Sequence, residues 1–259
     1  MALIVLCSAK GSPGVTTTAL ALGWVWPTAL PGRRSLVVDA DPAGSGVLPG
    51  FFQANAPQVG GILGLVRSGD GVEVDDLLTN AVALESSGER LVLPGIVDPA
   101  QARALAGVWS QLAHVAHDAD VQGLDILVDV GRLGHLHQPS ILLDRADLVV
   151  VVLRASLVSI AAARPAVGHL QELRGAGGAV VGALVGDQAP YTAKEIASEL
   201  GVEIPIVVPR DAVAARMFSD GIGNWSRMAR SPLLRSATAA AGQLVLRVPA
   251  LAPTEGWGA

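Results

Sequence analysis

Residues 3–18 read LIVLCSAKGSPGVTTT, and this stretch decides the fold. The apolar run Leu3–Leu6 has the composition of a buried strand, and the apolar pattern over Thr16–Leu30 is typical of a helix. A short loop that contains glycine joins the two segments. Consecutive backbone N–H groups and a helix N-terminus converge on such a loop. The stretch therefore predicts an anion site that suits a phosphate.

The rest of the chain alternates between strand-like and helix-like segments. Short β-branched runs occur at Ser35–Val38, Leu91–Leu93, Asp125–Val128, Leu148–Leu153, Ala179–Val185 and Ile204–Val208. Helical patterns lie between or after them, at Pro99–Ala119, Leu157–Arg174, Thr192–Leu200, Ala212–Phe218 and Ser231–Val248. Nearly continuous apolar strands are typical of a sheet covered on both faces. The alternation predicts an α/β fold, a three-layer αβα sandwich with a mostly parallel, doubly wound central sheet.

Length and composition indicate one globular domain. The chain has 259 residues, of which 51% are hydrophobic and 16% charged. We expect a single domain over residues 1–249 and a flexible tail at 250–259. Two segments, Gly44–Leu84 and Arg132–Asp144, have irregular patterns and follow strand ends, where ligand-contacting loops of open α/β sheets lie.

Cysteine content and hydropathy indicate the cellular compartment of the protein. The one cysteine, Cys7, excludes an internal disulfide and fits a reducing environment. No apolar stretch reaches the roughly 18–20 residues that a membrane span needs. The sequence therefore predicts a cytoplasmic protein without a transmembrane segment.

Charge is distributed unevenly. The net charge is −5, yet residues 204–259 contain six arginines and three acidic residues. An Arg-rich C-terminal third on an acidic body is suited to DNA, to an anionic membrane or to an acidic protein partner, although scattered arginines are also common on ordinary helix surfaces.

The loop and three later segments resemble a known family. The pattern Lys10-Gly-x-x-Gly-x-Thr16-Thr17 resembles the deviant Walker A motif of the ParA/MinD group of P-loop ATPases. Leu36-Val-Val-Asp39-Ala-Asp41 resembles the second strand of that group with its two aspartates, and Ile126-Leu-Val-Asp129 resembles its Walker B-type strand. The stretch 146–153 is similar to the next strand of the family. The resemblance spans most of residues 1–220 and implies a fold of the P-loop NTPase type.

The resemblance also implies a set of functional residues. ATP or ADP would bind through its phosphates to Lys10, Gly11, Ser12, Pro13, Gly14, Val15, Thr16 and Thr17. Mg²⁺ would be held by Thr16, Asp39 and Asp129. Lys10 would reach the nucleotide of the partner subunit in a homodimer, Asp41 would orient the attacking water, and Asp129 would support the metal, so that Lys10, Asp41 and Asp129 form the catalytic set.

The loop departs from the family at one position. Val15 stands where Walker A proteins carry the lysine that bridges the β- and γ-phosphates. A charged hydrogen bond contributes roughly 1.5–3 kcal/mol, so its loss predicts about 10- to 150-fold weaker nucleotide binding. Hydrolysis is expected to be slow or absent unless another cation acts there. Arg132 and Arg154, each after a strand end, are the candidate replacements.

Other candidate sites carry weaker signals. By resemblance, the nucleotide base would lie near Asp187, Pro209 and Asp211. The histidine pair His135 and His137 lacks the cysteine or third-ligand spacing of a metal site.

Two functions fit these residues. The first is an ATP-binding dimerisation switch, similar to ParA/MinD proteins, that positions DNA, division factors or large cytoplasmic assemblies. The second is a pseudo-ATPase that keeps the fold as a scaffold or regulatory module. A third class, relatives that deliver metal or electrons, uses cysteines that this chain lacks.

Overall fold

The computed structural model describes most of the chain: residues 3–11, 13–44, 46–55, 60–68, 71–175, 178–223 and 225–248. Ser12 of the loop and the predicted tail at 250–259 lie outside these ranges. None of the helices in the described ranges combines the length and apolar character that a bilayer span requires.

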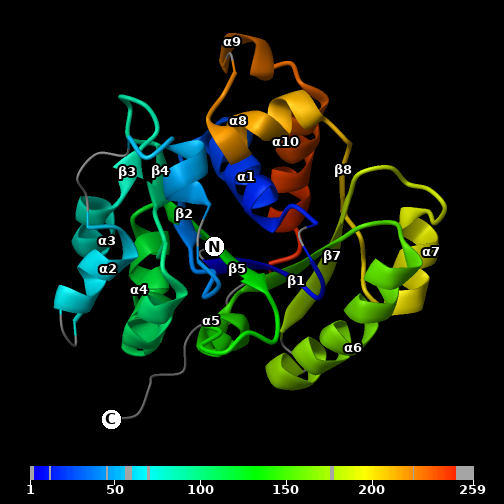
Figure 1. Ribbon diagram of the computed structural model, residues 1–259, viewed down its shortest axis with the longest axis horizontal. Coiled ribbons are helices and arrows are strands. Elements are labelled where there is room, and N and C mark those ends of the chain that lie inside the picture. The colour runs from blue at the N-terminus through cyan, green and yellow to red at the C-terminus, as the bar shows by residue number, and fades with distance from the viewer. Residues whose placement is uncertain are drawn as a thin grey trace.

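Eight strands of the described chain form one sheet in the order β3-β4-β2-β5-β1-β6-β7-β8 (Figure 1). Their bounds are β1 Leu3–Ser8, β2 Arg34–Asp39, β3 Val82–Ala83, β4 Arg90–Leu93, β5 Leu124–Arg132, β6 Leu148–Leu153, β7 Ala179–Val185 and β8 Ile206–Val208. Neighbouring strands pair in parallel, except that β3 runs antiparallel to β4. The predicted mostly parallel sheet is confirmed. Only β3 was missed, because two residues are too few to show a period.

Helices connect the strands, and six of the ten described α-helices lie at segments whose pattern predicted a helix. The α-helices are α1 Val15–Ala29, α2 Gly61–Leu65, α3 Val74–Asn80, α4 Ala106–Val121, α5 Ser140–Arg145, α6 Leu157–Arg174, α7 Ala193–Leu200, α8 Ala212–Asp220, α9 Trp225–Met228 and α10 Pro232–Val245. Shorter turns are the π-helix η1 Val47–Phe51 and the 3₁₀ helices η2 Val66–Ser68 and η3 Pro99–Leu105. The predicted helix Pro99–Ala119 is thus split, with a 3₁₀ segment before α4.

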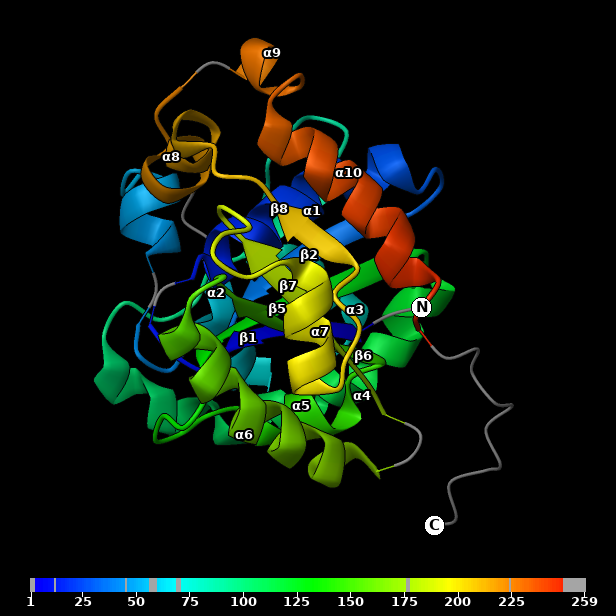
Figure 2. The ribbon, with the colours of Figure 1, turned by 90° about the vertical axis from the view of Figure 1, so that its right-hand side faces the viewer.

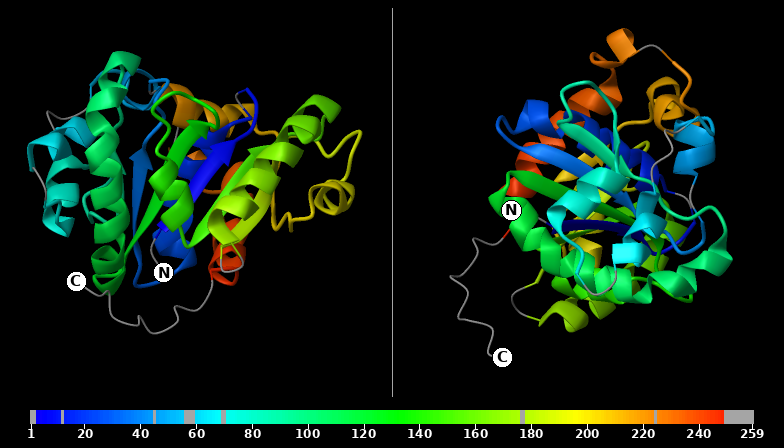
Figure 3. Two further views of the ribbon diagram at one scale, coloured as in Figure 1. Left: turned by 90° about the horizontal axis from the view of Figure 1, so that it is seen from below. Right: turned by 90° about the vertical axis from the view of Figure 1, so that its left-hand side faces the viewer.

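The sheet lies between two helical layers. Along β1, Leu3 and Val5 pack in the apolar cluster that contains α4, α5 and α6, whereas Ile4 and Leu6 pack in the cluster that contains α1, α8 and α10. Figure 2 shows α1 and α10 together on one face, and Figure 3 shows α4 and α6 over the other. Both faces of the central strands are therefore buried, which explains their continuous apolar runs. The three-layer prediction is confirmed.

A buried carboxylate ties α1 to the sheet away from the phosphate loop. Asp125, at the start of β5, is 1% exposed. Its carboxylate accepts hydrogen bonds from Trp26 Nε1 at 2.8 Å and from Arg33 Nε at 2.9 Å. The bond to Asp125 raises the pKa of Arg33, so this guanidinium remains charged. Both partners of the buried carboxylate are thus fixed.

Replacement of this carboxylate should destabilise the fold. We expect Asp125→Ala to lower the free energy of unfolding by about 1–3 kcal/mol, because it leaves the buried Trp26 Nε1 donor without its acceptor. Glu199→Ala is the matched control, since Glu199 pairs with Arg164 at 2.8 Å between two exposed side chains. That control should cost less than about 1 kcal/mol. Urea unfolding followed by circular dichroism measures both, and equal losses would contradict the structural role of Asp125.

Candidate functional site

The turn between β1 and α1 exposes backbone donors at its helical end. Gly14 precedes α1 with φ 103° and ψ 36°, a left-handed conformation that favours glycine. The first turn of α1 contains no acidic residue, and no side chain caps it. The first intrahelical bond runs from Thr18 N to Gly14 O at 2.9 Å. Helix geometry leaves the amides before Thr18 without intrahelical acceptors, and these amides are the donors that an anion needs.

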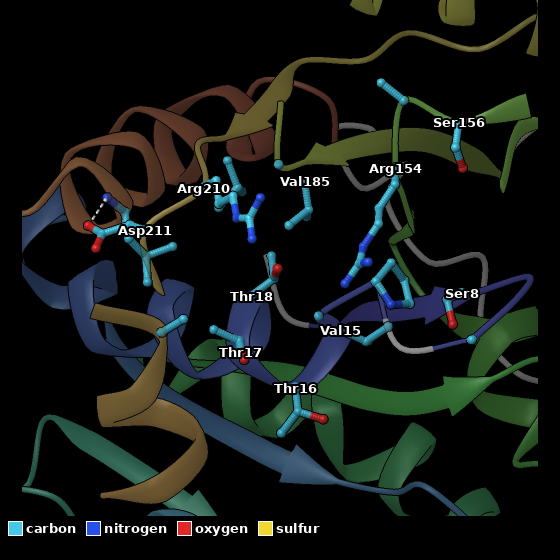
Figure 4. A pocket seen from close by; sticks show the side chains of 18 of the residues that line it. Ser8, Val15, Thr16, Thr17, Thr18, Arg154, Ser156, Val185, Arg210 and Asp211 are labelled. Carbon is cyan, nitrogen blue, oxygen red and sulfur yellow. Dashed lines mark hydrogen bonds between the residues drawn. The ribbon is translucent and has the colours of Figure 1, made fainter. Parts of the chain in front are cut away.

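This turn borders a large cleft of about 980 Å³ at the carboxyl ends of the parallel strands. Many of the predicted site residues line it together (Figure 4). They are Gly11, Pro13, Gly14, Val15, Thr16, Thr17, Asp41, Arg132, Arg154, Asp187, Pro209 and Asp211. The topology explains this convergence, because β1 lies between β5 and β6 and all three strands end at one edge.

Three predicted residues do not line the cleft. Lys10 is exposed in the loop and lies outside the lining. Asp39 and Asp129 are 3% and 1% exposed and sit behind the cleft wall. The two aspartates are direct neighbours in the register of β2 and β5.

Asp129 ties the first turn of α1 to the sheet. One carboxylate oxygen accepts the Thr16 hydroxyl at 2.5 Å, and the other accepts the Gly131 amide at 2.8 Å. Burial raises the pKa of the Asp129 carboxyl to about 6, the hydrogen bonds from Thr16 and Gly131 lower it, and the nearby Asp41 charge raises it. The site therefore holds a buried carboxylate whose ionised form is unfavourable without a cation.

Two glycines allow the backbone to approach the aspartates closely. A Cβ atom on Gly131, where φ is +64°, would lie 2.2 Å from Asp41 Oδ2. A Cβ atom on Gly95 would lie 2.8 Å from Asp39 Cγ. Sequence analysis missed Gly95, whose only signal is a glycine two residues after the end of β4.

Val15 is turned into the core. Its side chain is 6% exposed and packs in the apolar cluster that also contains Ile4, Leu6 and Val152. Val15 therefore lines the cleft with an apolar side chain that carries no charge.

Arginines line the cleft instead. Arg154 follows β6, and its side chain points from the strand end into the cleft toward the loop at Val15 (Figure 4). Arg132 is the last residue of β5, and Arg210, which sequence analysis did not single out as a cation, follows β8. The signal for Arg210 is its place two residues after the end of β8.

The base-binding candidates lie on the far side of the cleft from β1, at the ends of β7 and β8. Asp211 is engaged by main-chain amides, because its carboxylate accepts from Ala214 N at 3.0 Å and from Leu233 N at 3.4 Å. Asp187 and Pro209 line the cleft nearby. Among the residues that the structure describes, no group of three or more His, Cys, Asp and Glu side chains is arranged to hold a metal by itself. His135 lines the cleft without such partners.

The fold is similar to solved ATPase structures over nearly its whole length. The ParA family ATPase from Chlorobium tepidum TLS has a TM-score of 0.73 and 18% identity, covering 93% of this chain and 98% of its own. The cell division ATPase MinD from Pyrococcus furiosus has a TM-score of 0.71 and 19% identity, covering 95% and 99%. A Cyanothece McdA variant determined as an ATP complex has a TM-score of 0.63 and 18% identity, covering 98% and 99%.

The parallel sheet with its strand–loop–helix turn has a fold of the P-loop NTPase type. Within that type, the chain has the fold shared by ParA, MinD and McdA, and the resemblance read from the sequence is confirmed at the level of the fold. No protein-family sequence model matches the chain, and no curated protein matches it significantly.

Removal of the buried charge at Asp129 should stabilise the protein without ligand. The native pKa near 6 lies above the unfolded value, so the native state binds more protons between these values and loses stability as pH rises through this window. Asp129→Asn should therefore raise the Tm at pH 7.5 by about 2–4 °C per kcal/mol regained. The gain should shrink as pH falls toward about 4.

Calorimetric or fluorescence melts of the nucleotide-free protein measure this effect. Asp118→Asn, at an exposed position of α4, is the control and should change stability by no more than about 0.5 kcal/mol at either pH. A lower Tm for Asp129→Asn at pH 7.5, or a gain that does not change with pH, would contradict the assignment.

Proposed function

We propose that this protein is an ATP-binding dimerisation switch, similar to ParA/MinD proteins, that positions DNA, division factors or large cytoplasmic assemblies. The observation that carries the proposal is the left-handed Gly14 turn at the mouth of the cleft, with the Thr16–Asp129 hydrogen bond beneath it. A turn of this shape favours oxyanions through main-chain amides alone. It retains that capacity without the usual lysine.

The residues present fit a magnesium nucleotide. The amides of Val15, Thr16 and Thr17 would hold the phosphates, and Thr16 with Asp39 and Asp129 would hold Mg²⁺. The buried Asp129 carboxylate, whose ionised form is disfavoured by burial, is a group that a cation would stabilise. When bound, Mg²⁺ neutralises phosphate charge. Asp41, beside Gly131, would orient the attacking water.

The position of Lys10 supports a homodimer. Its exposed side chain lies outside the lining of its own cleft, as expected of a residue that reaches the nucleotide of a second subunit. For a DNA or protein partner, the Arg-rich C-terminal third gives weaker support. Arg216 pairs with Asp220 and Arg247 pairs with Glu203, so part of its positive charge is locally neutralised.

One observation favours the second candidate, a pseudo-ATPase scaffold or regulatory module without turnover. Val15 is buried among apolar side chains, so the usual cation is absent from the loop. A phosphate-release assay separates the two candidates. Slow wild-type turnover that Asp41→Ala abolishes supports the switch. No turnover, with dimers forming regardless of nucleotide, supports the scaffold.

Nucleotide binding should depend on the Gly14 conformation. We expect isothermal titration to show binding of MgATP to the wild type and at least about tenfold weaker binding to Gly14→Ala, because a left-handed alanine costs roughly 1–3 kcal/mol and the turn will shift. The added Cβ meets nothing closer than 3.9 Å, so the variant should fold.

Gly168→Ala is the matched control. Gly168 lies within α6, where a Cβ would meet nothing within 4 Å, and its variant should bind MgATP like the wild type. The proposal fails if the wild type binds neither ATP nor ADP at millimolar ligand with magnesium. Equal affinities for Gly14→Ala and Gly168→Ala would show that the nucleotide binds elsewhere.

A further inference from the structure

We propose that Arg154, in the turn between β6 and α6, supplies to the terminal phosphates of a bound nucleoside triphosphate the positive charge that Val15 cannot supply. This inference rests on the proposed function and assigns a specific residue to its phosphate site. It makes Arg154 a binding residue that discriminates triphosphates from monophosphates.

The sheet register places Arg154 beside the loop. β1 and β6 are parallel neighbours, with Cys7 paired to Val151. Both strands therefore end at the same edge of the sheet, and Arg154 lies three residues beyond Val151. It lines the cleft together with Gly14 and Val15.

Side-chain alternation along β6 directs Arg154 to the correct face. Leu148, Val150 and Val152 pack in the apolar cluster that contains α1, whereas Val151 and Leu153 pack in the opposite cluster. Arg154 continues the first row by the two-residue period of a strand. It therefore emerges on the face where Val15 packs, and Figure 4 shows its guanidinium above the loop.

The turn that carries Arg154 is well fixed by hydrogen bonds. The Arg154 amide donates to Ser159 Oγ at 3.0 Å, and the Arg154 carbonyl accepts from Ser156 N at 2.8 Å. Ser156 caps α6 by accepting from Ser159 N at 3.3 Å. An ordered turn reduces the entropy lost when the guanidinium contacts phosphate.

The other two arginines of the cleft are less well placed. Arg210 follows β8, which is separated from β1 by β6 and β7 in the strand order, and its neighbours in the cleft are the base-binding candidates. Arg132 pairs with Ser8 of β1 across a register shift and follows Gly131, whose φ is +64°, so the simple two-residue alternation does not direct its side chain toward Val15. Arg132 is the competitor that the experiment must separate from Arg154.

The chemistry of the side chain suits this role. A guanidinium presents paired N–H donors that match two phosphate oxygens, and it stays charged at all working pH values. A charge-assisted contact of this kind changes affinity by about 10- to 150-fold. Its effect should depend on the length of the phosphate chain.

Titrations with ATP and AMP in the presence of magnesium test the inference on the full chain. We expect Arg154→Gln to weaken ATP binding by about 10- to 150-fold and to change AMP binding by less than about threefold. Arg154→Lys should recover part of the ATP affinity. The matched control is Arg164→Gln on α6, whose side chain is 70% exposed and pairs with Glu199. It should bind both nucleotides like the wild type.

The outcomes distinguish this inference from the proposed function. Wild-type ATP binding that Arg154→Gln retains would overturn the role of Arg154 and leave the proposed function standing. A selective loss of ATP affinity in Arg132→Gln, and not in Arg154→Gln, would assign the phosphate-binding cation to Arg132. This result would also overturn the role of Arg154. If the wild type binds no nucleotide, both the proposed function and the role of Arg154 fall.

Discussion

The site depends on one backbone constraint, the left-handed turn at Gly14 between β1 and α1. This turn directs the first amides of α1 at the cleft, and the Thr16–Asp129 hydrogen bond fixes that first turn to β5. The carboxyl ends of β1, β5 and β6 then bring the aspartates and arginines around the same opening. The donors that this turn offers to the cleft are main-chain amides, since Val15 in the same turn is apolar and buried.

Beneath this turn, the buried charge of Asp129 lowers the stability of the fold. Asp129 is almost fully buried, and burial holds its pKa near 6. Asp125, equally buried, has the guanidinium of Arg33 and the indole of Trp26 as partners. The same nine-residue strand thus contains one compensated and one uncompensated carboxylate, four residues apart. An unfavourable buried charge next to a cleft is typical of a binding site for a cation or a polar ligand.

Much of the fold could be predicted because its signals are local. The apolar runs gave seven of the eight strands, and the loop at residues 10–17 located the cleft, since strand ends of a parallel sheet meet at one edge. Other features depend on tertiary contacts that no local pattern carries. The burial of Val15, the approach of Gly95 to Asp39 and the direction of Arg154 all follow from strand neighbours distant in sequence.

A structure with a non-hydrolysable ATP analogue and magnesium tests most directly whether the main-chain amides of the Gly14 turn bind phosphate. We expect the phosphate oxygens to lie within about 3.2 Å of the backbone nitrogens of Val15, Thr16 and Thr17. A closed turn at residues 10–17, with the analogue absent from the cleft or bound through other elements, would contradict this expectation.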